Sequence, residues 1–202
     1  MPTAHPGTPI DIRPMDLDDL SAVYALGERL FTADRWPYLY RSWEERELLD
    51  YYLSDGDTCL VADDGARVVG FAIGCIIEKR RSSWIYGYLG WLGVDPAVQG
   101  RQVAKRLLDR MRSLFVEEGV RMMLVDTAAT NQRALTFFHR YGFGHDVQHV
   151  YLSMNLTQDQ RHTGPPPPRA AARVRRAASP RQPMHTPPLR GGGPGGGDGE
   201  AE

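Results

Sequence analysis

Residues 94–108 read VDPAVQGRQVAKRLL, the end of an apolar strand followed by a turn and the start of a helix. Pro96 favours an end to the strand at Asp95, because a proline restricts the backbone of the residue before it. Val103 and Leu107 begin an apolar stripe at helical spacing, so the pattern predicts an amphipathic helix over residues 100–118. The strand therefore passes almost directly into a helix.

The start of this helix is suited to an anion. The first amides of a helix have no partner within it, and the aligned backbone dipoles make that end positive. Arg101, Lys105 and Arg106 add positive charge nearby. The segment predicts a pyrophosphate site, and the start of an ordinary surface helix is the alternative.

The remaining periodicities predict an α/β (α+β) fold. Before this stretch we expect a strand over 10–14, a helix over 16–31, a second helix opened by a capping box at residues 42–45, a hairpin of strands 58–62 and 68–77, and a strand over 84–94. After it we expect a strand over 122–127, a helix over 131–140 and a last strand over 145–154. This order predicts a mixed, mostly antiparallel central sheet with helices on both faces.

The composition of the chain changes after residue 156. Residues 157–202 hold nine of the 15 prolines, eight of the 21 glycines and no aromatic residue. We therefore expect a flexible N-terminus over 1–9, a folded domain over 10–156 and a disordered Pro/Gly/Arg-rich tail over 157–202. Seven arginines and no acidic residue lie between Arg161 and Arg190. They form either an electrostatic arm or a solubilising tail; without aromatic residues to stack on bases we favour the latter, and we expect no nucleic acid partner.

The sequence favours the cytoplasm. No stretch approaches the roughly 20 apolar residues of a membrane span, and the start MPTAHPGTPID lacks the features of a secretory signal, so we expect no membrane partner. Cys59 and Cys75 lie in apolar strand-like runs and are expected as buried thiols. His145 and His149 would lie about 13 Å apart on a strand, so we expect no metal site.

Two segments carry a resemblance to the GCN5-related N-acetyltransferase family. The family signature Gln/Arg-x-x-Gly-x-Gly/Ala resembles the helix start, where Gln99 and Ala104 match the outer positions and Gln102 replaces the middle glycine. Residues 131–143, NQRALTFFHRYGF, are similar to the family's Asn-x-x-Ala-x-x-x-Tyr-x-x-x-Gly-Phe. Residues 12–14, IRP, are similar to its first strand, so the resemblance covers about residues 10–156.

The resemblance implies an N-acetyltransferase that moves an acetyl (acyl) group from acetyl-CoA to an amine by direct attack. It implies that the strand before the turn binds the pantetheine arm through its backbone and that the helix start binds the pyrophosphate. The amide of Val94 also matches the family's oxyanion donor, and Asn131 is alternatively a helix cap. The implied cofactor-binding residues are Leu92, Gly93, Val94, Gln99, Gly100, Arg101, Gln102, Val103, Ala104, Lys105 and Asn131.

The catalytic roles of the family are harder to assign to residues of this sequence. Phe138 stands where the family has its acid tyrosine, and it has no proton to donate, so Tyr141 and His139 are candidates for a replacement. Asp126 matches an acidic position on the next strand and is our candidate base, with an ion pair or a cap of the turn as its structural alternative. The predicted catalytic residues are Asp126 and Tyr141.

The acceptor is not encoded in these motifs. A protein amine and a small molecule both remain open, and so does a homodimer. Tyr86 and Tyr88 share one face of their strand, where they either line an acceptor groove or pack; the aromatic residues around Pro37 leave the same choice. A non-catalytic acyl-CoA-binding regulatory module is the alternative function, suggested by Gln102 and Phe138.

Overall fold

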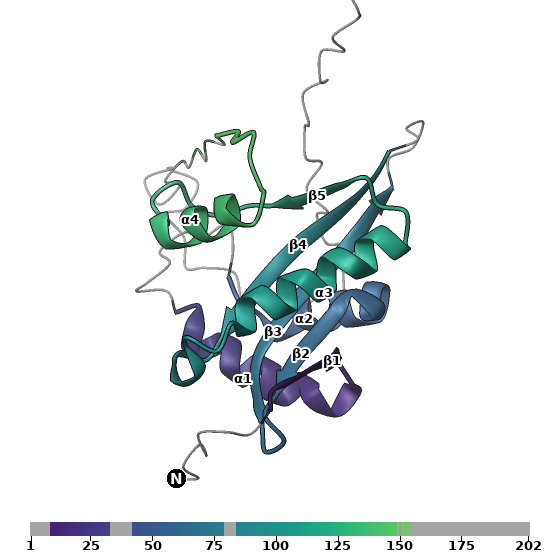
Figure 1. Ribbon diagram of the computed structural model, residues 1–202, viewed down its shortest axis with the longest axis vertical. Helices are drawn as coiled ribbons and strands as arrows, with labels where there is room; N and C mark the ends of the chain where they lie inside the picture. The colour runs from purple at the N-terminus through teal and green to yellow at the C-terminus, as the bar shows by residue number, and fades with distance from the viewer. Residues whose placement is uncertain are drawn as a thin grey trace, which may run out of the picture. The chain divides into compact units, whose positions relative to one another are not determined.

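The fold is given by a computed structural model that describes residues 9–32, 42–78, 84–148, 150, 152 and 154. The elements follow one another as in Figure 1: β1 (Asp11–Pro14), η1 (Leu17–Asp19), α1 (Leu20–Leu30), α2 (Glu45–Asp55), η2 (Gly56–Thr58), β2 (Cys59–Asp63), β3 (Val68–Glu78), β4 (Ile85–Val94), η3 (Pro96–Val98), α3 (Val103–Glu117), β5 (Met122–Val125) and α4 (Gln132–Arg140). All of them lie in the first of the two units into which the chain divides, Met1–Asp146, while the second begins at Val147. The prediction of one folded domain over 10–156 stays a prediction.

One five-stranded sheet carries the fold, in the order β1-β2-β3-β4-β5. The first four strands pair antiparallel, and β5 pairs parallel with β4 after the crossover through α3. The hairpin between β2 and β3 turns at Gly65, whose φ of 85° suits a glycine. The predicted mixed, mostly antiparallel sheet is confirmed.

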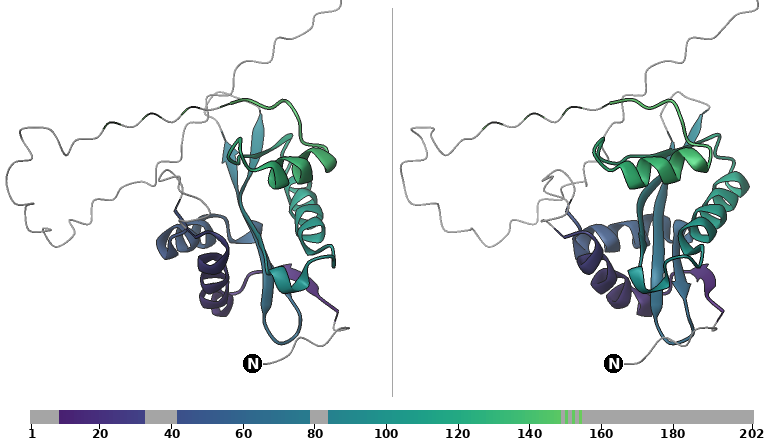
Figure 2. Two further views of the ribbon diagram at one scale, coloured as in Figure 1. Left: turned by 90° about the vertical axis from the view of Figure 1, so that its left-hand side faces the viewer. Right: turned by 60° about the vertical axis from the view of Figure 1, so that its left-hand side comes forward.

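Helices cover both faces of the sheet (Figure 2). On one face α1 and α2 bury Val23, Leu26 and Leu48 against alternate residues of β2 and β3. On the other face α3 buries its predicted apolar stripe, with Leu107 and Met111 fully enclosed. Burying apolar area on both faces is what holds the central strands, and it explains why β2 and most of β3 read as continuous apolar runs.

Two helix starts differ from the prediction. The helix α3 begins at Val103 rather than at Gly100, because Gly100 and Gln102 have φ values of 86° and 56°, which an α-helix does not allow. The expected capping box at Ser42 is wrong. Glu44 is the residue before α2, and the Ser42 hydroxyl donates to its carboxylate at 2.8 Å instead of capping a backbone amide.

The expected last strand is also wrong for the residues that can be compared. Residues 145–148, 150, 152 and 154 form no strand and are exposed, with Val150 and Leu152 at 81% and 91% exposure. Alternating apolar residues show which face a strand would bury, but a strand also needs a neighbouring backbone to pair with. The expected tail over 157–202 and residues 1–8 of the flexible N-terminus expected over 1–9 lie outside the described residues.

Candidate active site

Among the described residues, the last three residues of β4, 92–94, have a neighbouring strand on one side only. On one side β3 pairs with β4 as far as Val94, but on the other side β5 pairs only with Tyr86–Leu89. The predicted pantetheine residues Leu92, Gly93 and Val94 all lie on the stretch beyond β5. Their backbone therefore offers strand-like hydrogen bonds to an extended ligand.

The turn after β4 leaves the first amides of α3 without a helical partner. The Asp95 carboxylate accepts from the amide of Ala97 at 2.9 Å and so starts η3. Gly100 and Gln102 then take positive φ values, and the first helical bond of α3 runs from the amide of Arg106 to the carbonyl of Gln102 at 3.0 Å. The amides of residues 103–105 precede that bond, and Gln102 makes no side-chain cap, so this end of α3 fits an anion.

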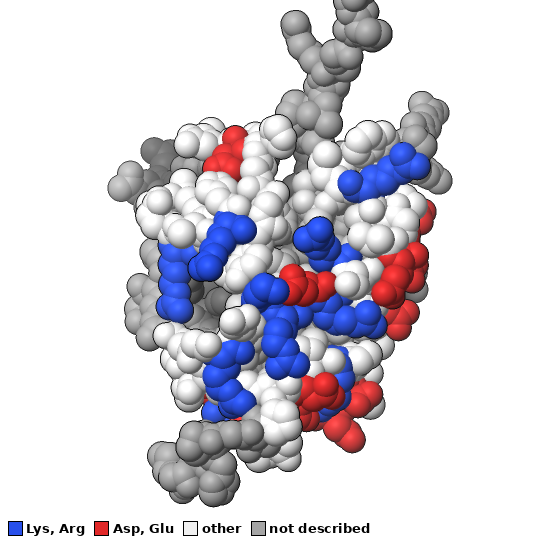
Figure 3. Space-filling model, in the orientation of Figure 1, with Lys and Arg blue, Asp and Glu red and all other residues white. Residues whose placement is uncertain are grey.

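Positive side chains gather over the face that carries α3 and α4 (Figure 3). The exposed basic residues of these segments are Arg101, Arg106, Arg110, Arg112, Arg133 and Arg140. Lys105 contributes less than the sequence suggests, because its ammonium is paired with Asp109 at 2.5 Å. The hydrogen bond to Asp109 raises the pKa of Lys105, and so does a smaller effect of the Tyr141 phenol. A polyanionic ligand is attracted to such a face.

The start of α4 is capped as predicted. The Asn131 side chain accepts from the amide of Ala134 at 3.2 Å and donates to the Thr127 hydroxyl at 3.0 Å. It fixes the connection from β5 into α4. Phe138 lies on the inner face of α4 and is 8% exposed, with the Phe143 ring centroid 5.3 Å from its own. It is a core residue without any polar group.

Asp126 lies on the face of the sheet that α1 and α2 cover. Met123 and Val125 pack into the core under α3, so by strand alternation Leu124 and Asp126 point to the other side. Leu89 also packs under α3, which places its neighbour Tyr88 beside Asp126. The Tyr88 hydroxyl donates a short hydrogen bond to Asp126 Oδ1. Sequence alternation put Tyr88 on one face with Tyr86, but nothing in the sequence paired it with Asp126.

Tyr141 lies on the opposite face of the sheet. It ends α4, packs against the core under α3, and its ring centroid is 4.8 Å from that of Phe137. The structure therefore does not bring the two predicted catalytic residues, Asp126 and Tyr141, together. His139 is exposed and pairs with Asp146 at 3.0 Å.

The buried cysteine, the possible metal ligands and the helix lengths also bear on what this protein can do. Burial raises the pKa of the Cys59 thiol to about 12, so this side chain stays protonated and is a poor nucleophile. Across the described ranges, no group of three or more His, Cys, Asp or Glu side chains is arranged to hold a metal ion. Within the same ranges no helix combines the length and the apolar character that crossing a membrane requires.

Comparison with known proteins agrees with this geometry. Residues 28–143 match the Acetyltransferase (GNAT) family. Similar solved structures include Ard1 from Thermoplasma volcanium, 21% identical over 67% of this chain and 82% of that chain, with a TM-score of 0.56. Another is an aminoglycoside acetyltransferase from an uncultured soil metagenomic sample in complex with sisomicin, 19% identical over 72% and 97%, with a TM-score of 0.58. A chain of the NatC complex bound to Gag peptide and CoA is 20% identical over 66% and 84%, with a TM-score of 0.55.

Proposed function

Because this chain belongs to the Acetyltransferase (GNAT) family, we propose that it is an N-acetyltransferase that moves an acetyl group from acetyl-CoA directly to an amine. One observation carries this proposal: residues 92–94 of β4, which lie beyond the pairing with β5, lead straight into the uncapped start of α3. An extended arm and a pyrophosphate would be bound there by neighbouring backbone groups. Cys59 and Cys75 are not joined in a disulfide, which supports our expectation of a reducing, cytoplasmic location.

In this proposal the backbone does most of the cofactor binding. Leu92, Gly93 and Val94 hold the pantetheine arm, the amide of Val94 polarises the thioester carbonyl, and residues 99–105 hold the pyrophosphate. Asn131 positions the start of α4 beside the arm. Side chains at these positions matter less than the path of the backbone, which agrees with a glutamine at position 102.

The amine attacks the carbonyl carbon, a C–N bond forms and the C–S bond breaks. Asp126 takes the proton of the amine, through Tyr88 or a water molecule, and the leaving thiolate gains a proton. The Tyr88–Asp126 hydrogen bond supports this role, because it fixes the carboxylate where β4 and β5 stop pairing. Tyr141 is the remaining candidate acid.

A thiol-release assay with acetyl-CoA and a panel of peptide N-termini, lysine peptides and small amines tests the activity. We expect CoA release that requires at least one of the amines and that reaches saturation as the concentration of this amine rises. Binding of CoA without release across the whole panel would reject the proposal. It would favour a non-catalytic acyl-CoA-binding module, for which the buried, apolar Phe138 in place of the acid tyrosine is the supporting observation.

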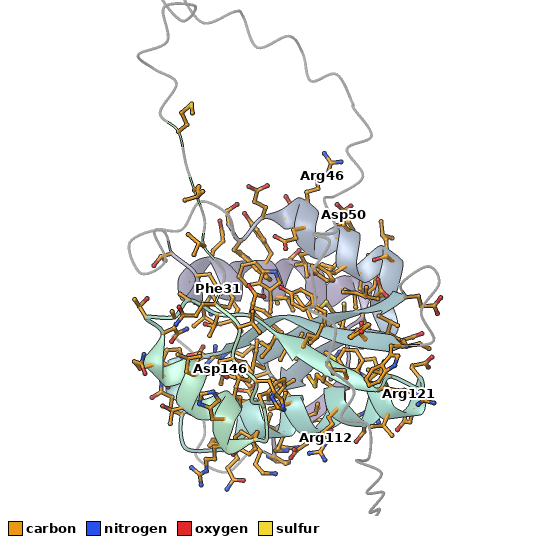
Figure 4. All side chains as sticks on the ribbon, turned by 90° about the horizontal axis from the view of Figure 1, so that it is seen from above. Phe31, Arg46, Asp50, Arg112, Arg121 and Asp146 are labelled. Carbon is orange, nitrogen blue, oxygen red and sulfur yellow. The ribbon has the colours of Figure 1, made fainter. Side chains whose placement is uncertain are left out.

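The role of Asp126 is tested by Asp126→Asn and Tyr88→Phe. With the best amine of the panel, we expect Asp126→Asn to lower kcat by about 10²-fold or more and to shift the rise of kcat/KM with pH, because proton removal is lost. Asp50→Asn, on the outer surface of α2, is the matched control (Figure 4). An unchanged kcat and pH profile in Asp126→Asn would leave Asp126 with a structural role only.

A further inference from the structure

The helix α4 is basic along one side. Arg133 and Arg140 are seven residues apart, so two helical turns bring them to the same side of α4, roughly 10 Å from each other. Both side chains are exposed, and neither guanidinium forms an ion pair or a hydrogen bond with any residue that the structure describes. The nine residues of α4 include no acidic residue to neutralise them.

The stability of the helix explains only one of these two charges. The backbone dipole of a helix favours cations in the last turn and disfavours them in the first. Arg140 occupies the last turn of α4, whereas Arg133 is the second residue of the helix, close to the cap at Asn131. Arg133 therefore lies against the dipole without an acidic partner on its helix, which favours a role in binding an anion.

The basic side of α4 borders α3. Phe137 lies between the two arginines on nearly the same side, and it packs against the core cluster that contains Val103 and Leu107 of α3. The two helices lie next to each other in both views of Figure 2. Positive side chains on α4 and at the start of α3 therefore face one shared stretch of surface (Figure 3).

CoA carries two separate anionic groups. Its pyrophosphate joins the pantetheine arm to the adenosine, and a further phosphate is attached to the 3′-oxygen of the ribose. In the proposed function the amides of residues 103–105 bind the pyrophosphate, and Arg106 lies in the same first turn of α3. The 3′-phosphate, one sugar away, needs other donors. An arginine guanidinium suits it, because it binds a phosphate through two parallel N–H···O bonds.

We propose that Arg133 and Arg140 bind the 3′-phosphate of CoA, so that α3 holds the pyrophosphate and α4 selects the complete cofactor. This inference rests on the proposed use of acetyl-CoA. A phosphate monoester carries a charge of about −1.5 to −2 at pH 7, which two arginines neutralise. The contact is remote from the thioester, so it acts on the affinity for the cofactor rather than on acetyl transfer itself.

Binding of CoA and of 3′-dephospho-CoA to the unmodified protein tests the proposal without any acceptor. The two ligands differ only in the 3′-phosphate. We expect isothermal titration calorimetry at low salt to give a Kd at least about tenfold lower for CoA, a difference of about 1.4 kcal/mol. Equal Kd values for the two ligands would overturn the inference while leaving cofactor binding intact.

Replacing both arginines, Arg133→Ala with Arg140→Ala, identifies the groups responsible. We expect the Kd of CoA to rise by about tenfold and that of 3′-dephospho-CoA to stay the same, so the ratio of the two Kd values falls toward one. Arg133→Ala alone should lower the ratio partway. The thermal midpoint should not change, because both side chains are exposed.

Arg121→Ala is the matched control. Arg121 is also exposed and forms no ion pair within the described part of the chain, but it follows the end of α3 that lies opposite the pyrophosphate turn (Figure 4). This variant should keep the ratio of the unmodified protein. A preserved ratio in the double variant, or a lost one in Arg121→Ala, would overturn the assignment. If the unmodified protein binds neither CoA nor 3′-dephospho-CoA, the proposed function itself fails.

Discussion

Gln102 holds a backbone conformation that costs free energy. Its φ of 56° lies in the left-handed region, where the Cβ of an L-residue approaches the following carbonyl oxygen at a cost of about 1–2 kcal/mol. Together with Gly100 at 86°, this conformation turns the chain from η3 into α3. The strain is therefore stored in the turn that we propose binds the pyrophosphate.

Replacing Gln102 by glycine should remove this strain. We expect Gln102→Gly to raise the free energy of unfolding by up to about 1 kcal/mol and to tighten CoA binding, because a glycine adopts this φ freely and lets a phosphate approach the backbone. Urea unfolding and a CoA titration measure the two effects. Arg101→Gly is the control for stability, since φ at Arg101 is not positive and a glycine there relieves no backbone strain. A gain of equal size in both variants would contradict the explanation.

For individual residues, the sequence gives the residue types but not the residues with which they form contacts. The cap at Asn131 follows from a local pattern, and the structure agrees with it. The pairs Tyr88 with Asp126 and Trp91 with Glu47 join residues 38 and 44 positions apart. Such contacts depend on strand order and on how α2 packs on the sheet, and no spacing along the chain encodes them.

Among the elements, the turn η3 is held by a network centred on Asp95. Its carboxylate accepts from Arg67 at 2.6 Å and from the amide of Ala97, and Arg29 of α1 lies 3.8 Å away. Burial raises the pKa of Asp95, but the hydrogen bonds from Arg67 and Ala97 together outweigh it, so the pKa is lower than usual. One side chain thus connects α1, the β2–β3 hairpin and the turn.

Asp95→Asn should loosen the turn. An asparagine oxygen still accepts from Ala97 but forms no ion pair with Arg67, which is partly solvated, so we expect a loss of about 1–2 kcal/mol in unfolding free energy. CoA affinity should fall as well, because the amides after η3 are less fixed. Urea unfolding and CoA titration provide the measurements, and Asp50→Asn serves as an exposed control expected to cost almost nothing. Unchanged CoA affinity in Asp95→Asn would show that the turn holds its shape without this network.

Most elements follow from periodicity, and the exceptions have physical causes. The apolar stripe of α3 and the turn at Gly65 are local features, and both appear where the sequence predicts them, although α3 itself begins at Val103. The start of α2 depended on which acceptor the Ser42 hydroxyl binds, and the last strand depended on a neighbouring backbone with which to pair. The Ser42 hydroxyl donates to the Glu44 carboxylate, and the exposed residues at 145–148, 150, 152 and 154 form no strand. A local sequence pattern predicts neither outcome.

For the whole molecule, the composition change after residue 156 predicts where the folded domain ends. The match to the family covers residues 28–143, and the described helices and strands end at Arg140. We expect a chain of residues 1–156 to keep the thermal midpoint within about 3 °C and to bind CoA with unchanged affinity and salt dependence, because residues 157–202 hold no aromatic residue to bury. Scanning calorimetry and CoA titrations of both chains provide the comparison. A large drop in the thermal midpoint or in CoA affinity would mean that the folded domain extends beyond residue 156.

The N-terminal strand is held to the molecule by charges, which makes its stability depend on pH. Arg13 of β1 donates to Asp19 at 2.6 and 2.9 Å and to Asp63 at 2.9 Å. The hydrogen bond from Arg13 lowers the pKa of Asp19, with a smaller contribution from the Asp16 amide, while burial opposes both. Because Asp19 is more acidic when folded, the unfolded chain binds its proton first as the pH falls. This stabilisation is therefore complete well above the unfolded pKa of about 3.9 and is lost as the pH falls through the folded pKa.

Asp19→Asn should thus lower the free energy of unfolding at pH 7 by about 1–3 kcal/mol, because Arg13 loses a nearly buried partner whose side chain is 11% exposed. The difference from the unmodified protein should shrink below about pH 4, where the aspartate of the unmodified protein is itself becoming protonated. Urea unfolding at pH 7, 5, 4 and 3 measures both effects. Asp18→Asn changes an exposed neighbour in the same turn and should follow the unmodified protein at every pH. A deficit in Asp19→Asn that stays constant down to pH 3 would mean that its cost comes from packing rather than from the charge.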